Sequence, residues 1–353
     1  DHGLTLIEKA PYGVIGAITP STNPTATIIN NSIGMVAGGN SVVFNVHPSA
    51  KEVSALVISI LNKAVVQAGG PENMMTGILN PTIQSAQELM QHRSVCLLVV
   101  TGGPGVVREA MNSGKKVIAA GPGNPPCVVD ETADLVKAGR DIVNGAGFDN
   151  NIVCICEKEI LAVDKITDSL KEELKKNGAF ELDQAQTEKI TELVIAEPGG
   201  PSKEGFPNKN FVGKDASVIA RQIGIDVPES TRILLCEVPK SHPLVWTEQL
   251  MPVMPIVRLN GVDTAIDAAL ECEHGFRHTA VMHSRNIEKL SRMAKVMSCS
   301  LFVKNGPCYC GLGHGGAGYT SFTIASPTGD GLTRASTFTR ERRCTLVDYF
   351  RIV

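Results

Sequence analysis

The strongest constraint on the fold is a regular alternation of short apolar runs and longer amphipathic segments between residues 14 and 119. The short runs are rich in Val and Ile and bounded by Gly, Pro or Asn, which predicts buried strands. Successive parallel strands need a helical crossover, so the alternation predicts a parallel sheet covered on both faces. The predicted strands are Val14–Ile18, Ser41–Phe44, Met74–Leu79, Val95–Val100 and Lys116–Ala119, and the predicted helices are Pro24–Ala37, Ser49–Ala68, Ile83–His92 and Pro104–Ser113.

A second α/β unit is predicted from about residue 125 onward, with a less tidy pattern. The charged, Gly- and Pro-rich segment Glu197–Asn210 is expected to be a surface loop. Alternating segments at the two ends, Leu4–Lys9 and Thr345–Val353, are expected to be strands that pair with another element or subunit. In this part the predicted strands are Ile160–Val163, Arg232–Cys236, Val253–Arg258, Thr279–His283 and Ser300–Val303, and the predicted helices are Thr132–Gly145, Asp164–Asn177, Asp183–Ile195, Val262–Glu271 and Asn286–Met297.

Charge and composition exclude several classes of function. The formal net charge of −3 offers no basic surface, so neither nucleic acid nor an anionic membrane is expected as the main partner. Aromatic residues make up only 4% of the chain, which argues against a stacking platform for single strands. No stretch approaches the length of about 18 apolar residues that indicates a membrane span. The ten cysteines are scattered and no secretory signal is visible, which predicts reduced thiols in the cytoplasm.

The most informative segment is a Gly- and Asn-rich approach, residues 144–153, that leads to Cys154. It places Cys154 between a predicted helix end and a strand start, where a thiol can be exposed. A thiolate adds to a carbonyl carbon and leaves readily, so it suits thiohemiacetal and thioester chemistry. The alternative is that Cys154 and Cys156 are small buried hydrophobic residues on a strand.

Two further segments end apolar strands and open helices. In the first, the amide of Asn23 is suited to donate to a developing oxyanion near a helix N-terminus, although Asn before Pro24 is also an ordinary N-cap. The second runs from Thr101 through Gly102 and Gly103, where backbone N–H groups suit a phosphate or ribose, or simply form a tight turn. The turn at 120–126, which includes Gly121, is expected to be an interdomain hinge or a cofactor-facing loop.

Histidines cluster at 274–283, and a neutral imidazole there suits proton transfer. A surface or satisfied core histidine is the alternative. Cys308, Cys310 and His314 raise the question of zinc, but a further ligand at a standard spacing is not evident, so no metal is expected.

Together these segments resemble the aldehyde dehydrogenase superfamily. Within it they resemble the CoA-acylating branch, the propionaldehyde and acetaldehyde dehydrogenases of bacterial microcompartments. The resemblance implies an α/β fold with a doubly wound parallel-sheet cofactor domain, an α/β catalytic domain and terminal oligomerisation strands. It covers essentially the whole chain and rests on residues 10–24, 39–44, 100–103, 148–154, 274–284 and 322–329.

The resemblance also implies roles for single residues. Cys154 would be the nucleophile, with Cys156 the next candidate. Asn23 would donate to the oxyanion beside the Cys154 backbone N–H, and His278 would be a general base or acid. The implied cofactors are NAD and coenzyme A. The cofactor-lining candidates are Thr19, Pro20, Ser21, Thr101, Gly102, Gly103, Gly121 and Glu248, of which Glu248 would contact the nicotinamide ribose.

Two departures from the wider superfamily are informative. Hydrolytic relatives have a Glu where this chain has Ala120, and that Glu activates the water that hydrolyses the thioester. Many relatives also place a Lys for the adenosine ribose where this chain reads Asn45-Val46-His47-Pro48. The implied reaction is oxidation of a short-chain aldehyde to a Cys154 thioester, followed by acyl transfer to CoA. A hydrolytic NAD(P)-dependent enzyme, and a catalytically weak truncated cargo or assembly protein of the same fold, stay open as alternatives.

The resemblance finally implies an organisation. We expect an oligomerisation strand at 1–12, a dinucleotide-binding domain at 13–124, a catalytic domain at 125–325, and a return segment with a second oligomerisation strand at 326–353. Family members carry further residues before the position of Asp1, so Asp1 is expected to mark a truncation. A homo-oligomer (dimer or tetramer) in the cytoplasm, inside a bacterial microcompartment and in contact with its shell or cargo, is the expected setting.

Overall fold

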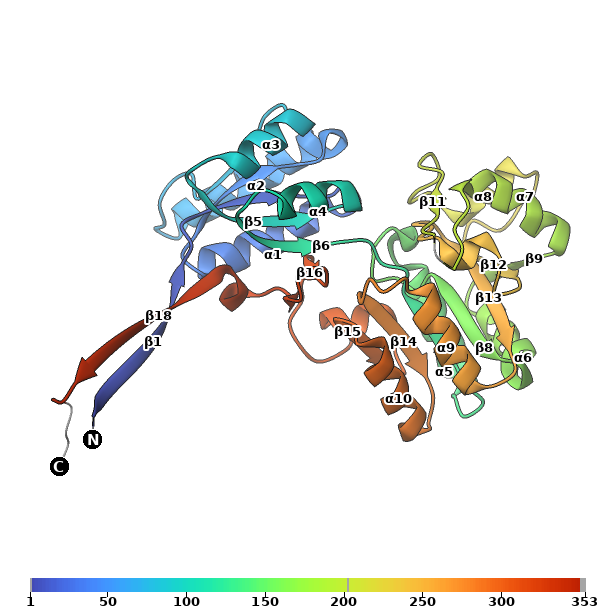
Figure 1. The fold of residues 1–353 in the computed structure, drawn as a ribbon. Helices are drawn as coiled ribbons and strands as arrows, with labels where there is room; N and C mark the ends of the chain where they lie inside the picture. Colours follow the sequence, from blue (N-terminus) through green and yellow to red (C-terminus); the bar gives the residue numbers. More distant parts are fainter. Residues whose placement is uncertain (1, 202, 350–353) are drawn as a thin grey trace. The chain divides into compact units, whose positions relative to one another are not determined.

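The computed structural model describes residues 2–201 and 203–349, and the end of the predicted strand Thr345–Val353, from 350 onward, lies outside the described residues. The chain divides into two compact units (Figure 1). The first unit runs to Gly121 and resumes at Ser321, and the second runs over Pro122–Thr320. The roles expected of these parts, cofactor binding and catalysis, stay predictions.

The first unit is built on a five-stranded parallel sheet of order β4-β3-β2-β5-β6. Every strand and helix predicted between 14 and 113 is confirmed, with ends that move by at most two residues. The short 3-10 helix η1 (Pro48–Ala50) precedes the second of these helices. The strands are β2 (Val14–Ile18), β3 (Ser41–Asn45), β4 (Met75–Gly77), β5 (Val95–Thr101) and β6 (Lys116–Ala120), and the helices are α1 (Pro24–Ala37), α2 (Lys51–Gln67), α3 (Ile83–Gln91) and α4 (Pro104–Met111).

Both faces of this sheet are buried, as the apolar runs require. Leu97 and Val99 of β5 pack in one core with residues of α1 and α2. The intervening Leu98 and Val100 pack in another core with residues of α3 and α4. Because side chains alternate along a strand, one uninterrupted apolar run supplies both cores.

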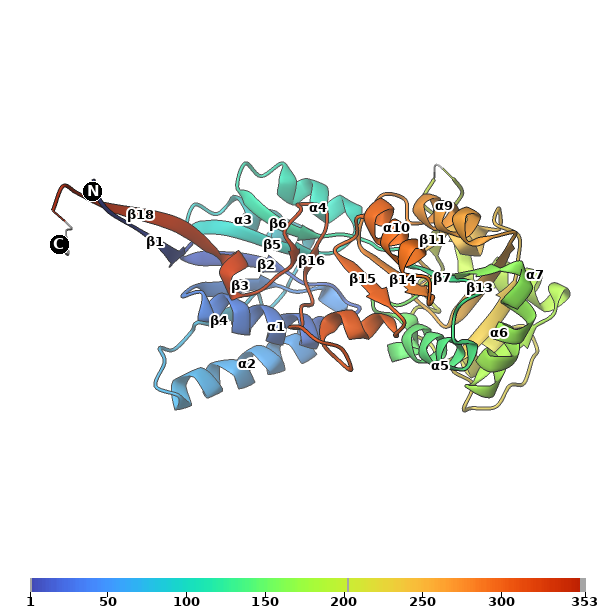
Figure 2. The ribbon, with the colours of Figure 1, turned by 90° about the horizontal axis from the view of Figure 1, so that it is seen from below.

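The second unit has a seven-stranded parallel sheet of order β15-β14-β7-β8-β13-β12-β9. Residues of α7, α8, α9 and α10 share one core on this sheet, and α5 packs beside α6 (Figure 2). The strands are β7 (Pro126–Val129), β8 (Glu159–Val163), β9 (Ala179–Leu182), β12 (Ile233–Glu237), β13 (Val253–Leu259), β14 (Thr279–His283) and β15 (Leu301–Lys304), and the helices are α5 (Leu135–Ala146), α6 (Asp164–Lys176), α7 (Gln184–Val194), α8 (Ala216–Gln222), α9 (Val262–Cys272) and α10 (Ile287–Met297).

Some expectations for the second unit were wrong. The expected loop Glu197–Asn210 contains β11 (Phe206–Pro207), which pairs antiparallel with β10 (Ile195–Glu197). The predicted helix Thr132–Gly145 begins only at Leu135, because the Asp134 side chain caps its N-terminus by accepting from Lys137 N–H. The strands β7 and β9 and the seven-residue helix α8 were not predicted, since elements this short carry little periodicity.

The terminal strands of the first unit form a two-stranded antiparallel ribbon, which Figures 1 and 2 show standing out from its sheet. β1 (Gly3–Pro11) pairs with β18 (Thr339–Val347), so the predicted partners do pair. The partner strand begins at Thr339, six residues before the predicted start at Thr345. Lys9 lies opposite Glu341 and forms an ion pair with it at 2.8 Å.

The return segment of the first unit, from Ser321, packs back onto the same sheet. It contains the strand pair β16 (Ile324–Ala325) and β17 (Gly331–Leu332) and the 3-10 helix η5 (Ala335–Phe338). The Phe338 ring lies 2.9 Å from the position that a Cβ on Gly34 would occupy, so α1 needs a glycine at that contact. Within residues 2–201 and 203–349, no helix is both long and apolar enough to cross a membrane.

Candidate active site

Cys154 lies in a tight turn between the end of α5 and the start of β8. The 3-10 turn η2 (Phe148–Asn151) follows α5, and Asp149, Asn150 and Asn151 adopt φ values of 47°, 51° and 63°. Asn and Asp tolerate this left-handed region better than other side chains, which explains the Asn-rich sequence. The expected position between a helix and a strand is confirmed, and the alternative that Cys154 and Cys156 lie on a strand is wrong, because β8 begins at Glu159.

The two cysteines of this turn differ in exposure. Cys156 is fully buried, and its Sγ approaches the carbonyl oxygen of Phe148 at 3.6 Å. Cys154 is only partly buried. A nucleophile must be reached by its substrate, so this difference favours Cys154 over Cys156.

Gly123 brings three of the predicted site residues together within the second unit. Its N–H donates to Glu248 Oε1 at 3.3 Å. A Cβ at Gly123 would stand 2.9 Å from His278 Cγ and 3.1 Å from the Cys154 carbonyl oxygen. Cys154, His278 and Glu248 therefore surround one buried glycine, close to the amino ends of β7, β8 and β14.

His278 is held rigidly with one ring nitrogen unpaired. Its backbone N–H donates to Glu273 Oε1 at 2.8 Å, and its Nδ1 shares a hydrogen bond with the Thr279 hydroxyl at 2.8 Å. Its buried Nε2 has no hydrogen-bond partner within the described residues. Burial, with a smaller contribution from the charge of Lys158, lowers the pKa of His278 to about 4. The imidazole is therefore neutral near pH 7 and able to accept a proton.

The surroundings of Cys154 disfavour its ionisation. Burial, followed by the nearby carboxylate of Glu248, raises the pKa of the Cys154 thiol to about 12, and the positive charge of Lys158 opposes this. Burial also raises the pKa of Glu248 to about 7. A thiol in this state needs a proton acceptor before it attacks a carbonyl carbon.

The candidate cofactor residues of the first unit meet at one edge of its sheet. The strand order reverses between β2 and β5, and the carboxyl ends of such neighbouring strands are where α/β sheets bind ligands. Thr19, Pro20 and Ser21 follow β2, while Thr101 ends β5 and leads into the glycines. The sequence thus places both groups of candidates at the switch point of the sheet.

Details at this edge fit a dinucleotide. The Thr19 hydroxyl is buried without a hydrogen-bond partner in the part of the chain that the structure describes. Gly103 caps α4 with no side chain over the helix N-terminus, and a Cβ there would meet no atom within 4 Å. Free backbone N–H groups at a helix start favour phosphate oxygens. Gly121 lies under Pro327, whose Cγ would be 3.1 Å from a Cβ at that glycine.

Asn23 does not use its side chain as an ordinary N-cap. Its backbone carbonyl accepts from Thr27 N–H at 3.1 Å, but no side-chain cap is formed. Its Oδ1 instead accepts from the hydroxyls of Thr22 at 3.2 Å and Thr27 at 3.4 Å. This orientation leaves the amide N–H₂ free of hydrogen bonds to the described residues, so it is able to donate to an oxyanion.

Several residues around Cys154 escaped the sequence reasoning. Gly123 acts through its backbone and lacks a side-chain signal. Glu157, Lys158 and Glu159 are completely buried, although three consecutive charged residues ordinarily indicate a surface. The available signal was their position between the apolar pairs 155–156 and 160–161.

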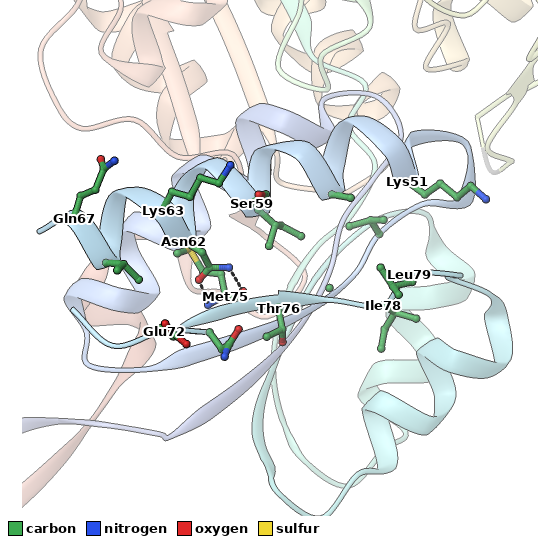
Figure 3. A pocket seen from close by; sticks show the side chains of 16 residues that line it. Lys51, Ser59, Asn62, Lys63, Gln67, Glu72, Met75, Thr76, Ile78 and Leu79 are labelled. Carbon is green, nitrogen blue, oxygen red and sulfur yellow. Dashed lines mark hydrogen bonds between the residues drawn. The ribbon is translucent and has the colours of Figure 1, made fainter. Parts of the chain in front are cut away.

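A separate cavity of about 640 Å³ lies between α2 and β4 in the first unit (Figure 3). The Asn62 side chain spans its floor by bonding both the N–H and the carbonyl of Met75, and Lys51 and Lys63 lie at its rim (Figure 3). None of the predicted site residues lines this cavity. In residues 2–201 and 203–349, no group of three or more His, Cys, Asp or Glu side chains is placed to hold a metal ion.

Comparison with known protein sequences agrees with the family resemblance inferred from the sequence. A family profile described as "Aldehyde dehydrogenase family" matches residues 1–188. The chain is 52% identical to the acetaldehyde dehydrogenase (acetylating) EutE of Salmonella typhimurium, covering 100% of this chain and 76% of that protein.

Comparison with solved structures also finds propionaldehyde dehydrogenases among the similar proteins. The propionaldehyde dehydrogenase of Rhodopseudomonas palustris, with bound CoA and an acylated cysteine, has a TM-score of 0.94 and 52% identity over 98% of this chain and 78% of that one. A propionaldehyde dehydrogenase from the fucose utilisation microcompartment of Clostridium phytofermentans has a TM-score of 0.95 and 48% identity over 100% and 80% of the two chains. The α/β fold expected from the sequence is confirmed by these structures.

Proposed function

The chain belongs to the aldehyde dehydrogenase family, and from this premise we propose that it is a CoA-acylating, NAD-dependent enzyme that oxidises a short-chain aldehyde, propionaldehyde or acetaldehyde. The observation that carries the proposal is the turn at Cys154, whose backbone carbonyl packs against the same glycine, Gly123, as the neutral imidazole of His278. The names of the similar proteins support the substrate class, and the acylated cysteine in one of them supports a thioester.

Cys154 provides the nucleophile. Its proton passes to a neutral acceptor, for which His278 Nε2 is the candidate, and its sulfur then bonds to the aldehyde carbon. The proposed donors to the resulting oxyanion are the Cys154 backbone N–H and, from the family resemblance, the side-chain amide of Asn23. Collapse of this adduct with loss of hydride leaves an acyl thioester on Cys154.

The hydride acceptor is NAD⁺, which supplies this chemistry when bound. Thr19, Pro20, Ser21, Thr101, Gly102, Gly103 and Gly121 are the proposed lining of its site in the first unit. Their support is the switch-point position and the uncovered start of α4. In the second unit, Glu248 is the proposed ribose contact.

Release of the acyl group by CoA, and not by water, follows from Ala120. This residue ends β6 and is buried, and its methyl group has no capacity to activate water. A thiol such as that of CoA attacks a thioester readily without such a base, which regenerates the Cys154 thiolate. His278 is also the proposed acceptor of the proton that the incoming thiol loses.

The test is an assay of NADH formation from propionaldehyde and from acetaldehyde, with and without CoA, in which acyl-CoA and free acid are both quantified. We expect sustained NADH formation only with CoA, and one acyl-CoA for each NADH. Formation of free acid at the same rate without CoA would assign the chain to the hydrolytic class instead. Absence of turnover under all conditions would favour an inactive cargo or assembly protein.

The proposal extends to the setting of the enzyme. A homo-oligomer, dimer or tetramer, is supported by the exposed ribbon of β1 and β18, since isolated two-stranded ribbons are barely stable in water. A cytoplasmic location inside a bacterial microcompartment, in contact with its shell or cargo, is supported by the origin of the C. phytofermentans protein. Fluorescent tagging in a host that expresses a microcompartment operon tests the location, and diffuse fluorescence would contradict it.

A further inference from the structure

Lys158 is a fully buried lysine directly beneath the turn that carries Cys154. Its Nζ donates to the Asn151 carbonyl oxygen at 2.8 Å, to Asn151 Oδ1 at 2.6 Å and to the Val153 carbonyl oxygen at 3.3 Å. An ammonium group has three protons, and these three acceptors satisfy all of them. Every hydrogen bond of the side chain is therefore spent on the residues that immediately precede the cysteine.

These contacts close the turn from inside. Asn151 is in the left-handed conformation, and its Nδ2 donates to the carbonyls of Ala146 at 2.8 Å and Glu157 at 2.9 Å. Asn151 thus links the end of α5 to the start of β8, and Lys158 fixes both its carbonyl and its side-chain oxygen. Removing the ammonium would leave the carbonyl oxygen and the Oδ1 of Asn151 without their donor, while the Val153 carbonyl oxygen would keep the Cys156 N–H at 3.0 Å.

The charge of Lys158 acts on three buried carboxyl groups, those of Glu157, Glu159 and Glu248, and opposes the rise that burial causes in their pKa values. Across the described residues, Lys158 takes part in no ion pair, while other buried or half-buried lysines such as Lys171 do. A buried ammonium group without a direct ion pair is costly unless hydrogen bonds satisfy it, as the three acceptors in the turn do here. The same charge also acts on Cys154 and His278, and its effect is to lower the pKa of both.

We propose that Lys158 is the positioning residue of this site: its ammonium, bound to the carbonyl of the residue before Cys154, holds the Cys154 turn in shape and sets a positive charge beside that turn. This inference rests on the proposed role of Cys154 as nucleophile. It assigns no contact between Lys158 and substrate, because the side chain points into the turn and is completely covered.

The test compares charged and uncharged replacements of similar polarity, Lys158→Arg and Lys158→Gln, together with Lys158→Met. The measurement is the rate at which iodoacetamide alkylates Cys154 between pH 7 and 9, followed by mass spectrometry of the peptide that contains Cys154. Loss of a nearby positive charge raises the thiol pKa, so we expect the rate at fixed pH to fall by about tenfold or more in the Gln and Met variants. The Arg variant is expected to remain within about threefold of the original protein.

Lys171→Met is the matched control. Lys171, on α6, is also largely buried, but it forms ion pairs with Glu181 on β9 and Glu237 on β12. It is expected to leave the alkylation rate unchanged. Equal rates in folded Lys158→Gln, Lys158→Arg and original protein would overturn the inference, as would an equal fall in the Lys171 control. If Lys158→Met does not fold, the alkylation rates of the Gln and Arg variants still show whether the charge of Lys158 matters.

Alkylation needs neither aldehyde, NAD⁺ nor CoA, so it separates this inference from the proposed function. Failure of the proposed function shows as missing CoA-dependent turnover in the original protein, whatever the alkylation rates. We further expect kcat for aldehyde oxidation to fall with the alkylation rate across the variants, while KM for NAD⁺ stays unchanged. A change in KM for NAD⁺ with an unchanged kcat would contradict a role at Cys154.

Discussion

At the scale of single residues, Cys154 reaches its position through backbone conformations that Asp and Asn adopt more easily than other residues. Three successive left-handed residues, Asp149 to Asn151, turn the chain sharply after α5. Such strain persists only where the surroundings hold it, and here the side chains of Asn151 and Lys158 do so. The same turn buries Cys156 while it leaves Cys154 accessible.

This difference predicts opposite outcomes for the two cysteines. Cys154→Ser is expected to lower kcat for CoA-dependent aldehyde oxidation by at least about 10³-fold, because a hydroxyl is a much weaker nucleophile than a thiolate. Cys156→Ala, the matched control, removes only a buried sulfur and is expected to keep most of the activity. Steady-state NADH formation by both variants checks this, and an active Cys154→Ser protein would transfer the role to another residue.

His278 makes a prediction about pH. Because folding holds its pKa near 4, below the ordinary value of 6.5, the unfolded chain binds a proton between these values that the native protein does not. Its contribution to stability is therefore complete above pH 6.5 and is lost as the pH falls toward 4. His278→Asn removes this dependence. The free energy of unfolding of the original protein should decrease by up to about 3 kcal/mol relative to the variant between pH 7 and 4.

Urea unfolding of both proteins across this pH range provides the measurement. Taking the difference between the two proteins cancels the contributions of other groups to the pH dependence. Glu157 and Glu248 are among them: burial raises their pKa values, so they stabilise the fold as the pH falls, opposite to His278. A difference that does not change with pH would show that His278 is not kept neutral by the fold.

At the scale of elements, the sequence predicts the first unit well because its strands are continuous apolar runs and its helices carry clear start and stop residues. Pro24 and Pro104, for example, begin α1 and α4 as expected. The second unit is less readable. β7 emerges directly from a Gly- and Pro-rich turn, and its four residues are a strand only because two neighbouring strands provide hydrogen bonds.

Only some residues of the candidate site could likewise be named from the sequence. Cys154 and His278 were named from sequence segments and Glu248 from the family resemblance, and the structure gathers them around Gly123, while their roles stay predictions. Gly123 and Lys158 were not named, because their importance lies in contacts with residues far along the chain. Local pattern alone does not report which backbone group a buried glycine touches.

Gly123→Ala tests that arrangement. Its Cβ would lie 2.9 Å from His278 Cγ and 3.1 Å from the Cys154 carbonyl oxygen, so at least one of them must move. Because small misplacement of reacting groups is costly, we expect kcat to fall by about 10²-fold with a modest loss of stability. Gly200→Ala, where a Cβ meets no atom within 4 Å and which lies outside the candidate site, is the control. Steady-state kinetics and thermal unfolding measure both effects, and full activity of Gly123→Ala would mean that the site tolerates a wider spacing.

At the scale of the whole molecule, the ribbon of β1 and β18 exposes apolar side chains that a surface facing only water would not favour. Its strands are largely exposed on both faces, with Leu6 and Ile7 exposed by 53% and 59%. A ribbon with free edges and apolar side chains is a template for pairing with another chain. The ion pair between Lys9 and Glu341 supports the register of the ribbon, and in residues 2–201 and 203–349 its two strands form a sheet only with each other.

The proposed oligomer should therefore depend on the ribbon. Leu6→Asp places a charge on the exposed apolar surface of the ribbon. Burying that charge in a contact between copies would be costly, so we expect the protein to shift from a dimer or tetramer to a monomer. Val136→Asp, at a position on α5 that is exposed by 66%, serves as the control and should leave the assembly intact. Light scattering coupled to size-exclusion chromatography measures the mass of each protein. An unchanged mass in Leu6→Asp, with the ribbon still folded, would place the contact between copies on a different surface.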